Sequence, residues 1–494
     1  MKIKTAAEMM EATLVKASAA LFDKEINDFS IDSRTTHPGD LFFALSPADY
    51  TRAGFNGTFD DAHRFIPQAF ARGAIAAVAR GERVAGDETL APFHDRLLLV
   101  EDAIAALQKL AHRVYQAWAR PVIGITGSAG KTTTKELTAH VLAASGRRVL
   151  KSERNYNNGL GLPLSVLQMV SAGRKPENFD IAVLEMGMSS PTGEIKRLCH
   201  ITPPDIGVEL NVAPVHLEFF GTVENIARYK RELIEGLKPT GTAVLNADDE
   251  HVIAMSASHK GHVVTFGIEN QADVMATDIE TTEFGLIRFK LRTLHEVIPA
   301  QLRLTGKHNL MNALAASAVA TCLDISVREI AGALESTVPP HMRGEILRFT
   351  DGFTVIDDSY NSNPRSLLSM VRTLVEGGNT GARRILVAGE MLELGIDGPR
   401  LHREVGREIA RCGVNILWGV RGLAAEMIDG AREAGMSKER TRFFADSDQA
   451  AAALVAEVRD GDLVLVKGSR GVRTDKVIEG LRASFQLTRT GKGE

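Results

Sequence analysis

A glycine-rich segment at residues 124–134 has the composition of a phosphate-binding loop. It reads Gly-Ile-Thr-Gly-Ser-Ala-Gly-Lys-Thr-Thr-Thr and lies between an apolar run and a helix-like stretch. Backbone N–H groups and the helix dipole favour an anion there, a lysine (Lys131) reaches the terminal phosphates, and a hydroxyl (Thr132) can hold Mg²⁺. The usual loop has a glycine at the position of Ile125, so an ordinary glycine turn is the alternative. The predicted phosphate site consists of Gly127, Ser128, Ala129, Gly130, Lys131, Thr132 and Thr133.

Two further polar residues follow predicted strands. Glu185 ends an apolar run at 181–184, and His216 follows the next apolar run at 206–210. Ligands of open α/β sheets collect at the carboxyl ends of strands, and a carboxylate beside a phosphate loop suits Mg²⁺. The alternatives are a glutamate on a surface turn and a structural or solvated histidine.

Lys230 and two asparagines lie on predicted helices. Charged neighbours surround Lys230 in the helical stretch 225–236, and this pattern alone predicts a solvated helix face. Asn309 and Asn312 are spaced i, i+3 at the start of an alanine-rich helix at 309–322, and amide side chains can present donors and acceptors to a heterocycle. A helix cap is the alternative for Asn309.

Two polar clusters occur near the C-terminus. Asp357 and Asp358 precede a loop of Ser, Tyr and Asn, where they could hold ribose hydroxyls, although an Asx-rich turn is also typical before proline. Lys467-Gly-Ser-Arg470 follows a predicted strand and could clamp an anion, the alternative being a basic turn.

The elements around these residues predict an α/β fold. Three domains are expected, because a chain of 494 residues is too long to fold around one hydrophobic core. Residues 1–120 are predicted to form a small N-terminal α/β domain with a surface loop at 49–60. Residues 121–338 alternate strands and helices, which predicts a central parallel-sheet domain containing the phosphate loop. Short consecutive strands at 262–304 predict an antiparallel insert or edge. Prolines 339 and 340 mark a boundary, and 339–494 are predicted to form a Rossmann-like domain.

Composition restricts the class of protein. There are 58 Lys and Arg against 62 Asp and Glu, which argues against a nucleic-acid-binding protein driven by counterion release. Three widely separated cysteines without metal-ligand spacing fit a reducing cytoplasm. Because no long apolar segment occurs, neither a signal peptide nor a membrane span is expected.

Taken together and in this order, the motifs resemble the Mur ligase superfamily of ATP-dependent amide-forming enzymes. The resemblance covers nearly the whole chain. The pieces that carry it are Asp32-Ser-Arg34 with Pro38-Gly-Asp-Leu-Phe, the 124–134 loop, Asn155-Tyr-Asn157-Asn158-Gly-Leu-Gly-Leu-Pro163, Glu185-Met-Gly187, His216-Leu-Glu, Lys230, Gly306-Lys-His-Asn-Leu-Met-Asn-Ala, Asp357-Asp-Ser-Tyr-Asn-Ser-Asn-Pro, Gly389-Glu-Met-Leu-Glu-Leu-Gly395 and Val466-Lys-Gly-Ser-Arg470. Three of the last pieces, Asp-Asp-Ser-Tyr-Asn, Glu-Met-Leu-Glu-Leu-Gly and Lys-Gly-Ser-Arg, favour the members that join D-alanyl-D-alanine to a UDP-N-acetylmuramoyl-tripeptide.

The resemblance implies ATP and two Mg²⁺ ions as cofactors. It implies that Lys131, Thr132 and Glu185 hold the phosphates and a first Mg²⁺, and that His216 and Lys230 lie at a second. It also implies that Lys230 carries a carbamate formed from CO₂, which reverses the solvated-face interpretation. The remaining implied ATP contacts are Asn309 and Asn312 at the adenine, Asp358 at the ribose and Arg343 at the γ-phosphate. The order Met342-Arg343-Gly344 departs from the family's more usual Gly-Arg.

For the substrates, the resemblance implies one domain each. The implied contacts are Asp32, Ser33 and Arg34 with the uridine diphosphate, Asn157 and Asn158 with the sugar and diphosphate, and Tyr360, Asn361, Lys467, Ser469 and Arg470 with the substrates at the C-terminal domain that takes the dipeptide. The implied reaction converts the tripeptide carboxylate to an acyl phosphate, which the dipeptide amine then attacks. A cytoplasmic monomer acting in cell-wall precursor synthesis is expected.

Three alternatives stay open. A sister ligase adds diaminopimelate or lysine one step earlier, and Asn363-Pro364-Arg365 is similar to its Asn-Pro-Arg motif. A folate polyglutamate synthase has similar ATP machinery but is not expected to have a uridine-type N-terminal domain. A non-catalytic nucleotide-binding protein need not keep Lys131, Glu185, His216 and Lys230 together.

Overall fold

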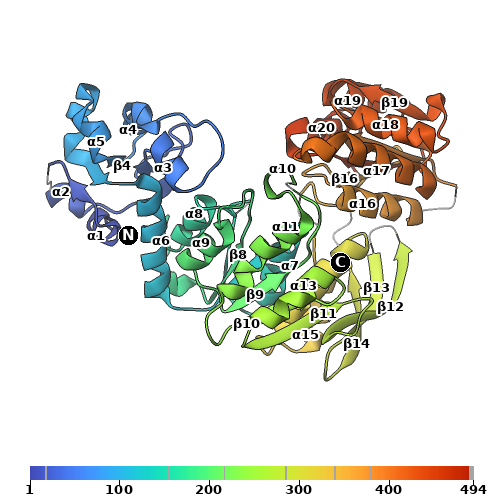
Figure 1. Cartoon of the computed structure of the whole chain (residues 1–494), viewed down its shortest axis with the longest axis horizontal. Coiled ribbons are helices and arrows are strands. Elements are labelled where there is room, and N and C mark those ends of the chain that lie inside the picture. Colours follow the sequence, from blue (N-terminus) through green and yellow to red (C-terminus); the bar gives the residue numbers. More distant parts are fainter. Residues whose placement is uncertain are drawn as a thin grey trace.

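The structure is a computed structural model and describes residues 1–16, 19–153, 155–215, 217–283, 286–338, 341–377 and 381–488. Each of three sheets, with its helices, forms a domain (Figure 1). The predicted α/β class with three domains is therefore confirmed. The predicted boundary prolines 339 and 340 lie outside the described residues.

The N-terminal domain is built on a sheet with the strand order β1-β5-β4-β3-β2. Only the β1–β5 pair is antiparallel. The strands are β1 Thr13–Leu14, β2 Phe29–Ser30, β3 Leu41–Phe43, β4 Ala76–Arg80 and β5 Leu97–Val100, and the helices are α1 Ile3–Met10, α2 Ala19–Phe22, α3 Pro47–Arg52, α4 Ile66–Ala71, α5 Gly81–Ala85 and α6 Ala103–Trp118. Every residue of β3 and β4 is buried, as their apolar runs predict.

The predicted surface loop at 49–60 is wrong in its first part. Ser46 caps helix α3 in a capping box with Asp49, and Pro47 occupies the first turn, so these polar residues start a helix. The Asp49 side chain is fully buried, and its Oδ1 accepts a hydrogen bond from Arg80 at 2.9 Å. A segment whose composition is typical of loops therefore contributes one partner, Asp49, to a buried ion pair.

The central sheet has the order β14-β13-β12-β11-β10-β9-β6-β8-β7. The strands are β6 Val122–Thr126, β7 Val149–Lys151, β8 Ile181–Glu185, β9 Ile206–Glu209, β10 Thr242–Asn246, β11 His262–Gly267, β12 Val274–Glu283, β13 Leu286–Arg292 and β14 Val297–Leu302. The helices are α7 Lys131–Ala144, α8 Gly161–Leu167, α9 Glu194–Ile201, α10 Leu217–Phe220, α11 Val223–Lys230, α12 Glu232–Glu235, α13 Glu250–Ile253, α14 Lys307–Thr321 and α15 Val327–Glu335. Helices α7, α14 and α15 share one apolar core with the sheet, and α6, α8 and α9 share another.

Two details of the central domain differ from the prediction. The predicted helix 225–236 is two helices, α11 and α12, which are interrupted at Arg231. The antiparallel edge begins one strand later than predicted, because β11 is parallel to both β10 and β12, and only β12, β13 and β14 pair antiparallel. The carboxylate of Asp248 accepts hydrogen bonds from the backbone N–H groups of Ile268, Glu269 and Asn270. These bonds fix the connection between β11 and β12, which is not a hairpin turn.

The C-terminal domain has the strand order β15-β16-β20-β17-β18-β19, with β15 antiparallel at one edge. The strands are β15 Glu345–Arg348, β16 Thr354–Asp358, β17 Arg384–Gly389, β18 Ile416–Val420, β19 Thr441–Phe444 and β20 Leu463–Lys467, and the helices are α16 Pro364–Glu376, α17 Gly398–Cys412, α18 Ala424–Glu433, α19 Ser447–Glu457 and α20 Asp475–Ser484. Separate apolar clusters cover the two faces of the sheet, as in doubly wound folds.

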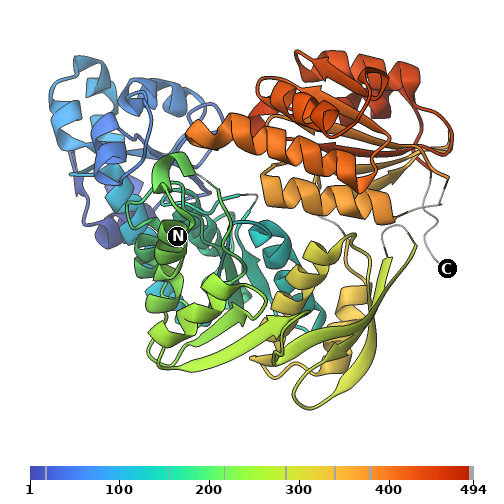
Figure 2. The ribbon, with the colours of Figure 1, turned by 45° about the vertical axis from the view of Figure 1, so that its right-hand side comes forward.

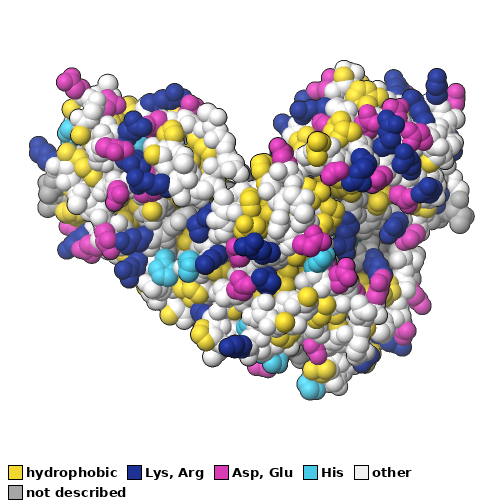
Figure 3. Space-filling model, in the orientation of Figure 1, with side chains coloured by type: hydrophobic (Ala, Val, Ile, Leu, Met, Phe, Trp, Pro, Cys, Tyr) yellow, Lys and Arg dark blue, Asp and Glu magenta, His cyan; other side chains and the backbone are white. Residues whose placement is uncertain are grey.

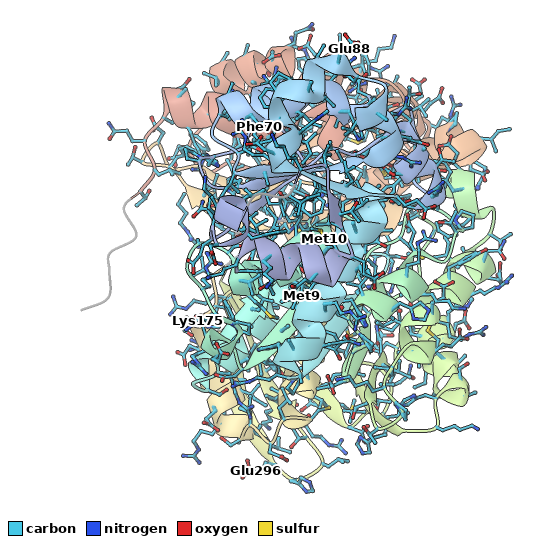
Figure 4. All side chains as sticks on the ribbon, turned by 90° about the vertical axis from the view of Figure 1, so that its left-hand side faces the viewer. Met9, Met10, Phe70, Glu88, Lys175 and Glu296 are labelled. Atoms are coloured by element: carbon cyan, nitrogen blue, oxygen red, sulfur yellow. The ribbon has the colours of Figure 1, made fainter. Side chains whose placement is uncertain are left out.

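The N-terminal and C-terminal domains both lie against the central domain (Figures 1 and 2). The space-filling view shows a hollow between them (Figure 3). On the N-terminal side, α1 with Met9 and Met10 lies where the first domain meets the second (Figure 4), and one core cluster continues from α1 and α6 into the central domain. No helix within the described ranges is long and apolar enough to cross a membrane.

Candidate active site

The candidate site is a cleft of about 450 Å³ between the central and C-terminal domains. Strand ends and helix starts of both domains line it. The predicted site residues that line it are Ser128, Ala129, Gly130, Lys131, Thr132, Thr133, Asn157, Asn158, Glu185, Asn309, Asn312, Arg343, Asp358, Tyr360, Asn361, Lys467, Ser469 and Arg470. The fold therefore brings together motifs that are more than 300 residues apart in sequence.

The glycine-rich loop connects β6 to α7, as expected for a phosphate loop. Gly127 and Gly130 have positive φ angles of 154° and 86°, and a Cβ atom at Gly130 would overlap the side chain of Asn312. The side chain of Asn211 fixes the loop, because its Oδ1 accepts from Ala129 N at 2.9 Å and its Nδ2 donates to Ala129 O at 3.0 Å. The Ser128 hydroxyl donates to Ala213 O at 3.2 Å. Free backbone N–H groups at the start of α7 face an anion in such a loop.

Lys131 is the cation of the loop. Its Nζ donates to Gly127 O at 2.7 Å, which curls the side chain over the loop that it would use to hold phosphates. Burial lowers the pKa of Lys131, while the negative charges of Glu185 and Glu209 oppose that shift and the positive charge of Arg343 adds to it. The negative charges of two carboxylates therefore stabilise the charged form of Lys131.

Thr132 and Glu185 offer oxygen ligands for a divalent cation. The Thr132 hydroxyl donates to Glu185 Oε2 at 2.8 Å, and Asn157 Nδ2 donates to Glu185 Oε1 at 2.8 Å. Glu185 ends β8, which pairs in register with the loop strand β6. A hydroxyl and a carboxylate that already meet beside a phosphate loop match the donor set of Mg²⁺.

Lys230 and Glu209 are two buried ionisable side chains whose charges influence each other, and sequence reasoning did not find Glu209. Lys230 is only 2% exposed, so the solvated helix face predicted from charge pattern is wrong. Glu209 ends β9 and is fully buried, and neither of its carboxylate oxygens has a hydrogen-bond partner among the described residues. Burial raises the pKa of Glu209 to about 8 and lowers the pKa of Lys230 to about 7, and the opposite charge of each partner counteracts both shifts.

Asn309 and Asn312 lie side by side in the first turns of α14. Asn309 Nδ2 donates to Thr305 O at 2.8 Å, and Asn312 Nδ2 donates to Asn309 Oδ1 at 3.3 Å. Gly306 is the N-cap of α14, so Asn309 is not the cap that the alternative interpretation required. The pair adjoins the phosphate loop at Gly130.

The C-terminal domain contributes an ion pair at its sheet edge. Asp358 ends β16 and Lys467 ends β20, and the two residues are register partners whose Oδ2 and Nζ atoms are 2.5 Å apart. Lys467 Nζ also donates to Asn361 O at 2.8 Å. Arg343 lies over the Tyr360 ring with 4.1 Å between its guanidinium carbon and the ring centroid. These groups face the phosphate loop across the cleft.

We expect replacement of Lys467 by Met to lower the free energy of unfolding of the C-terminal domain by about 3 kcal/mol, because Asp358 would keep a largely buried charge without its partner. Urea unfolding followed by Trp418 fluorescence in a Trp118→Phe background measures this loss, since these are the two tryptophans. The double variant Asp358→Asn/Lys467→Met should recover most of the loss. A single-variant loss below about 1 kcal/mol would contradict the interpretation.

Several predicted residues lie outside the cleft lining. Gly127 belongs to the loop but is not part of the cleft lining, and Lys230 is buried. In the N-terminal domain, Arg34 pairs with Asp32 at 2.7 Å, and the buried Ser33 donates its hydroxyl to Gln68 Oε1 at 2.8 Å. Their predicted uridine contacts stay predictions. His216 lies outside the described residues.

The cleft also contains residues that the prediction omitted. They are Asn155, Gly187, Met188, Ser189, Glu194, His308, Asn363, Ser366, Met370, Leu392, Glu393 and Gly471. Burial lowers the pKa of His308 to about 4, and its Nδ1 is hydrogen-bonded to the Ser369 hydroxyl at 3.0 Å. Most of these residues lie within or beside the family-like pieces of the sequence, so proximity to those pieces was the available signal.

Comparison with known proteins agrees with this geometry. The Mur ligase middle domain matches residues 125–320, and the Mur ligase, glutamate ligase domain matches residues 342–470. The UDP-N-acetylmuramoyl-tripeptide–D-alanyl-D-alanine ligase of Bacillus subtilis is 32% identical over 479 residues, which cover 97% of this chain and 98% of that protein.

Solved structures give the same result. A crystal structure of MurF from Acinetobacter baumannii has a TM-score of 0.83 and 28% identity, with 98% of each chain covered. The MurF ligase of Thermotoga maritima in complex with ADP has a TM-score of 0.77 and 30% identity, covering 93% of this chain and 97% of that one. The similarity therefore extends through all three domains.

Proposed function

Because this chain belongs to the Mur ligase family, we propose that it is an ATP-dependent ligase that joins D-alanyl-D-alanine to a UDP-N-acetylmuramoyl-tripeptide in peptidoglycan precursor synthesis. The observation that carries the proposal is that Lys131 and the phosphate loop line the same cleft as Asp358 and Lys467 of the C-terminal domain. A cytoplasmic location and a monomeric state remain predictions.

The proposed reaction begins with phosphoryl transfer. The tripeptide carboxylate attacks the γ-phosphate of ATP, which gives an acyl phosphate and ADP. Lys131 and the loop N–H groups bind and orient the phosphates, and Arg343 approaches the γ-phosphate from the C-terminal side. Mg²⁺, held by Thr132 and Glu185, would neutralise charge on the transferred group.

The second step is amide formation. The amine of D-alanyl-D-alanine attacks the acyl carbonyl, the tetrahedral intermediate collapses, and inorganic phosphate leaves. Tyr360, Asn361 and the Lys467–Arg470 segment, at the C-terminal edge of the cleft, are proposed to bind and orient substrate there. Closure of the domains would exclude water from the acyl phosphate.

Lys230 is proposed to carry a carbamate and to lie, with His216, at a second cation. Its burial beside Glu209 supports this role, because a buried amine with a lowered pKa is available in its neutral, CO₂-reactive form. An anion at this position would help to hold a divalent cation.

The proposal predicts phosphate release that requires both substrates. With ATP, Mg²⁺ and a UDP-muramoyl-tripeptide, we expect continuous phosphate release only after D-alanyl-D-alanine is added, because the acyl phosphate turns over when an amine accepts it. A coupled phosphate assay measures this. Turnover with a UDP-muramoyl-dipeptide and a free diamino acid would instead support the sister ligase, and inactivity with every muramoyl substrate would contradict the proposal.

A further inference from the structure

Glu209 is a buried carboxylate at the edge of the central sheet, and no described residue donates a hydrogen bond to it. It ends β9 and is register partner of Thr126, which ends β6 and directly precedes Gly127 of the phosphate loop. Register partners on parallel strands point to the same face of the sheet, and the Thr126 hydroxyl, like both Glu209 oxygens, lacks a hydrogen-bond partner within the described part of the chain. Three unpartnered oxygen atoms thus share one face beside the loop.

Such a group needs a physical explanation. A buried carboxylate without a hydrogen bond is costly, which is why burial raises the pKa of Glu209, and a bound cation or water would relieve that cost. The charges that act most strongly on Glu209 are those of Lys230 and Lys131, yet neither lysine donates a hydrogen bond to it. The surroundings are therefore polar and charged, but no described side chain satisfies the carboxylate.

Glu209 and Glu185 end the two strands that neighbour the phosphate-loop strand, and because their register partners Thr126 and Ile125 are adjacent residues, the two carboxylates point to opposite faces of the sheet. Strand β6 lies between β8 and β9, and each of these neighbours ends in a glutamate, with Glu185 paired to Ile125 and Glu209 to Thr126. Carboxylates consequently flank the phosphate-loop strand on both sides. Glu185 is bonded to Thr132 and Asn157, whereas Glu209 retains its full capacity to bind another group.

We propose that Glu209 supplies an additional carboxylate to the divalent-cation site of this ligase, beside Lys131 and Lys230. Carboxylate and hydroxyl oxygens are the donors that hard cations prefer, and Glu209 and Thr126 provide both next to the predicted phosphate site. The inference rests on the proposed function, because that function requires divalent cations with ATP. A structural water bound to Glu209 is the competing explanation.

The test measures Mn²⁺ binding to the full-length, ADP-loaded protein by electron paramagnetic resonance. We expect Glu209→Gln to weaken Mn²⁺ affinity about tenfold or more, because residues that support a metal site are typically worth that much. The control is Glu235→Gln, which removes the same charge from an exposed side chain that pairs with Arg231 near Lys230. The control should bind Mn²⁺ as the unaltered protein does.

Mn²⁺ affinity of Glu209→Gln within about twofold of the unaltered protein would overturn the inference and assign Glu209 to a structural water. If Glu209→Gln does not fold, Glu209→Asp takes its place; it retains the charge on a shorter arm, so weaker Mn²⁺ binding supports the inference and unchanged binding overturns it. Amide formation by the unaltered protein separates the two proposals. If the unaltered protein turns over muramoyl substrates but the variant binds Mn²⁺ normally, only the proposed role of Glu209 is contradicted. If the unaltered protein does not turn over these substrates, the proposed function is contradicted.

Discussion

Replacing Lys131 by Ala is expected to lower kcat/KM for ATP-dependent amide formation by about a thousandfold or more. Groups that stabilise charge on a transferred phosphoryl group are typically worth that factor. The Lys131 ammonium lies at the cleft, at the start of α7, and already bonds to the loop that would surround the phosphates. Phosphate release under saturating tripeptide and D-alanyl-D-alanine measures the loss.

A matched control separates this effect from a general loss of positive charge. Lys151 is a half-exposed lysine of the same domain that pairs with Glu136, and it does not line the cleft. Lys151→Ala should retain activity within about twofold, as for most surface substitutions. If Lys131→Ala lost less than about tenfold, the phosphate-loop assignment would be wrong.

The strands that could be predicted from the sequence are those whose burial is visible in a local run of apolar residues. Fully buried strands such as β6, β8 and β20 are continuous apolar runs, and the polar residues directly after them mark the sheet edge where ligands collect. The short edge strand β19 was not predicted, because two of its four residues are exposed and it therefore lacks an apolar run.

The remaining errors have tertiary causes. Lys230 has the charged neighbours of a solvated helix, but α11 shares an apolar cluster with β10, and both Ile226 and Lys230 are buried. Asp49 is interpreted from the sequence as part of a polar loop, because its ion-pair partner Arg80 lies on β4, 31 residues away, where the local pattern does not show it. Glu209 is a single acidic residue at the end of an apolar strand, and only the sheet register shows that it faces Thr126 beside the phosphate loop. Local periodicity does not contain such pairings.

Lys230 is the position where the second large effect is expected. Lys230→Ala should lower turnover by about a hundredfold to a thousandfold, since it would remove an anion proposed to support a cation beside the transferred phosphoryl group. A short-chain carboxylic acid such as acetate should restore part of the activity, because its carboxylate can occupy the space that the side chain leaves. Phosphate release with increasing acetate measures the rescue.

The neighbouring Arg231 provides the control for Lys230. It is partly exposed and pairs with Glu235, so Arg231→Ala should keep near-normal turnover and gain nothing from acetate. The unaltered protein should also lose activity when CO₂ is removed from the buffer, and regain it with bicarbonate, whereas Lys230→Ala should not respond to either. Full activity of Lys230→Ala in CO₂-depleted buffer would exclude the carbamate. Loss of activity without rescue by any carboxylic acid would instead favour a direct role for the amine, since a carboxylate could then not replace it.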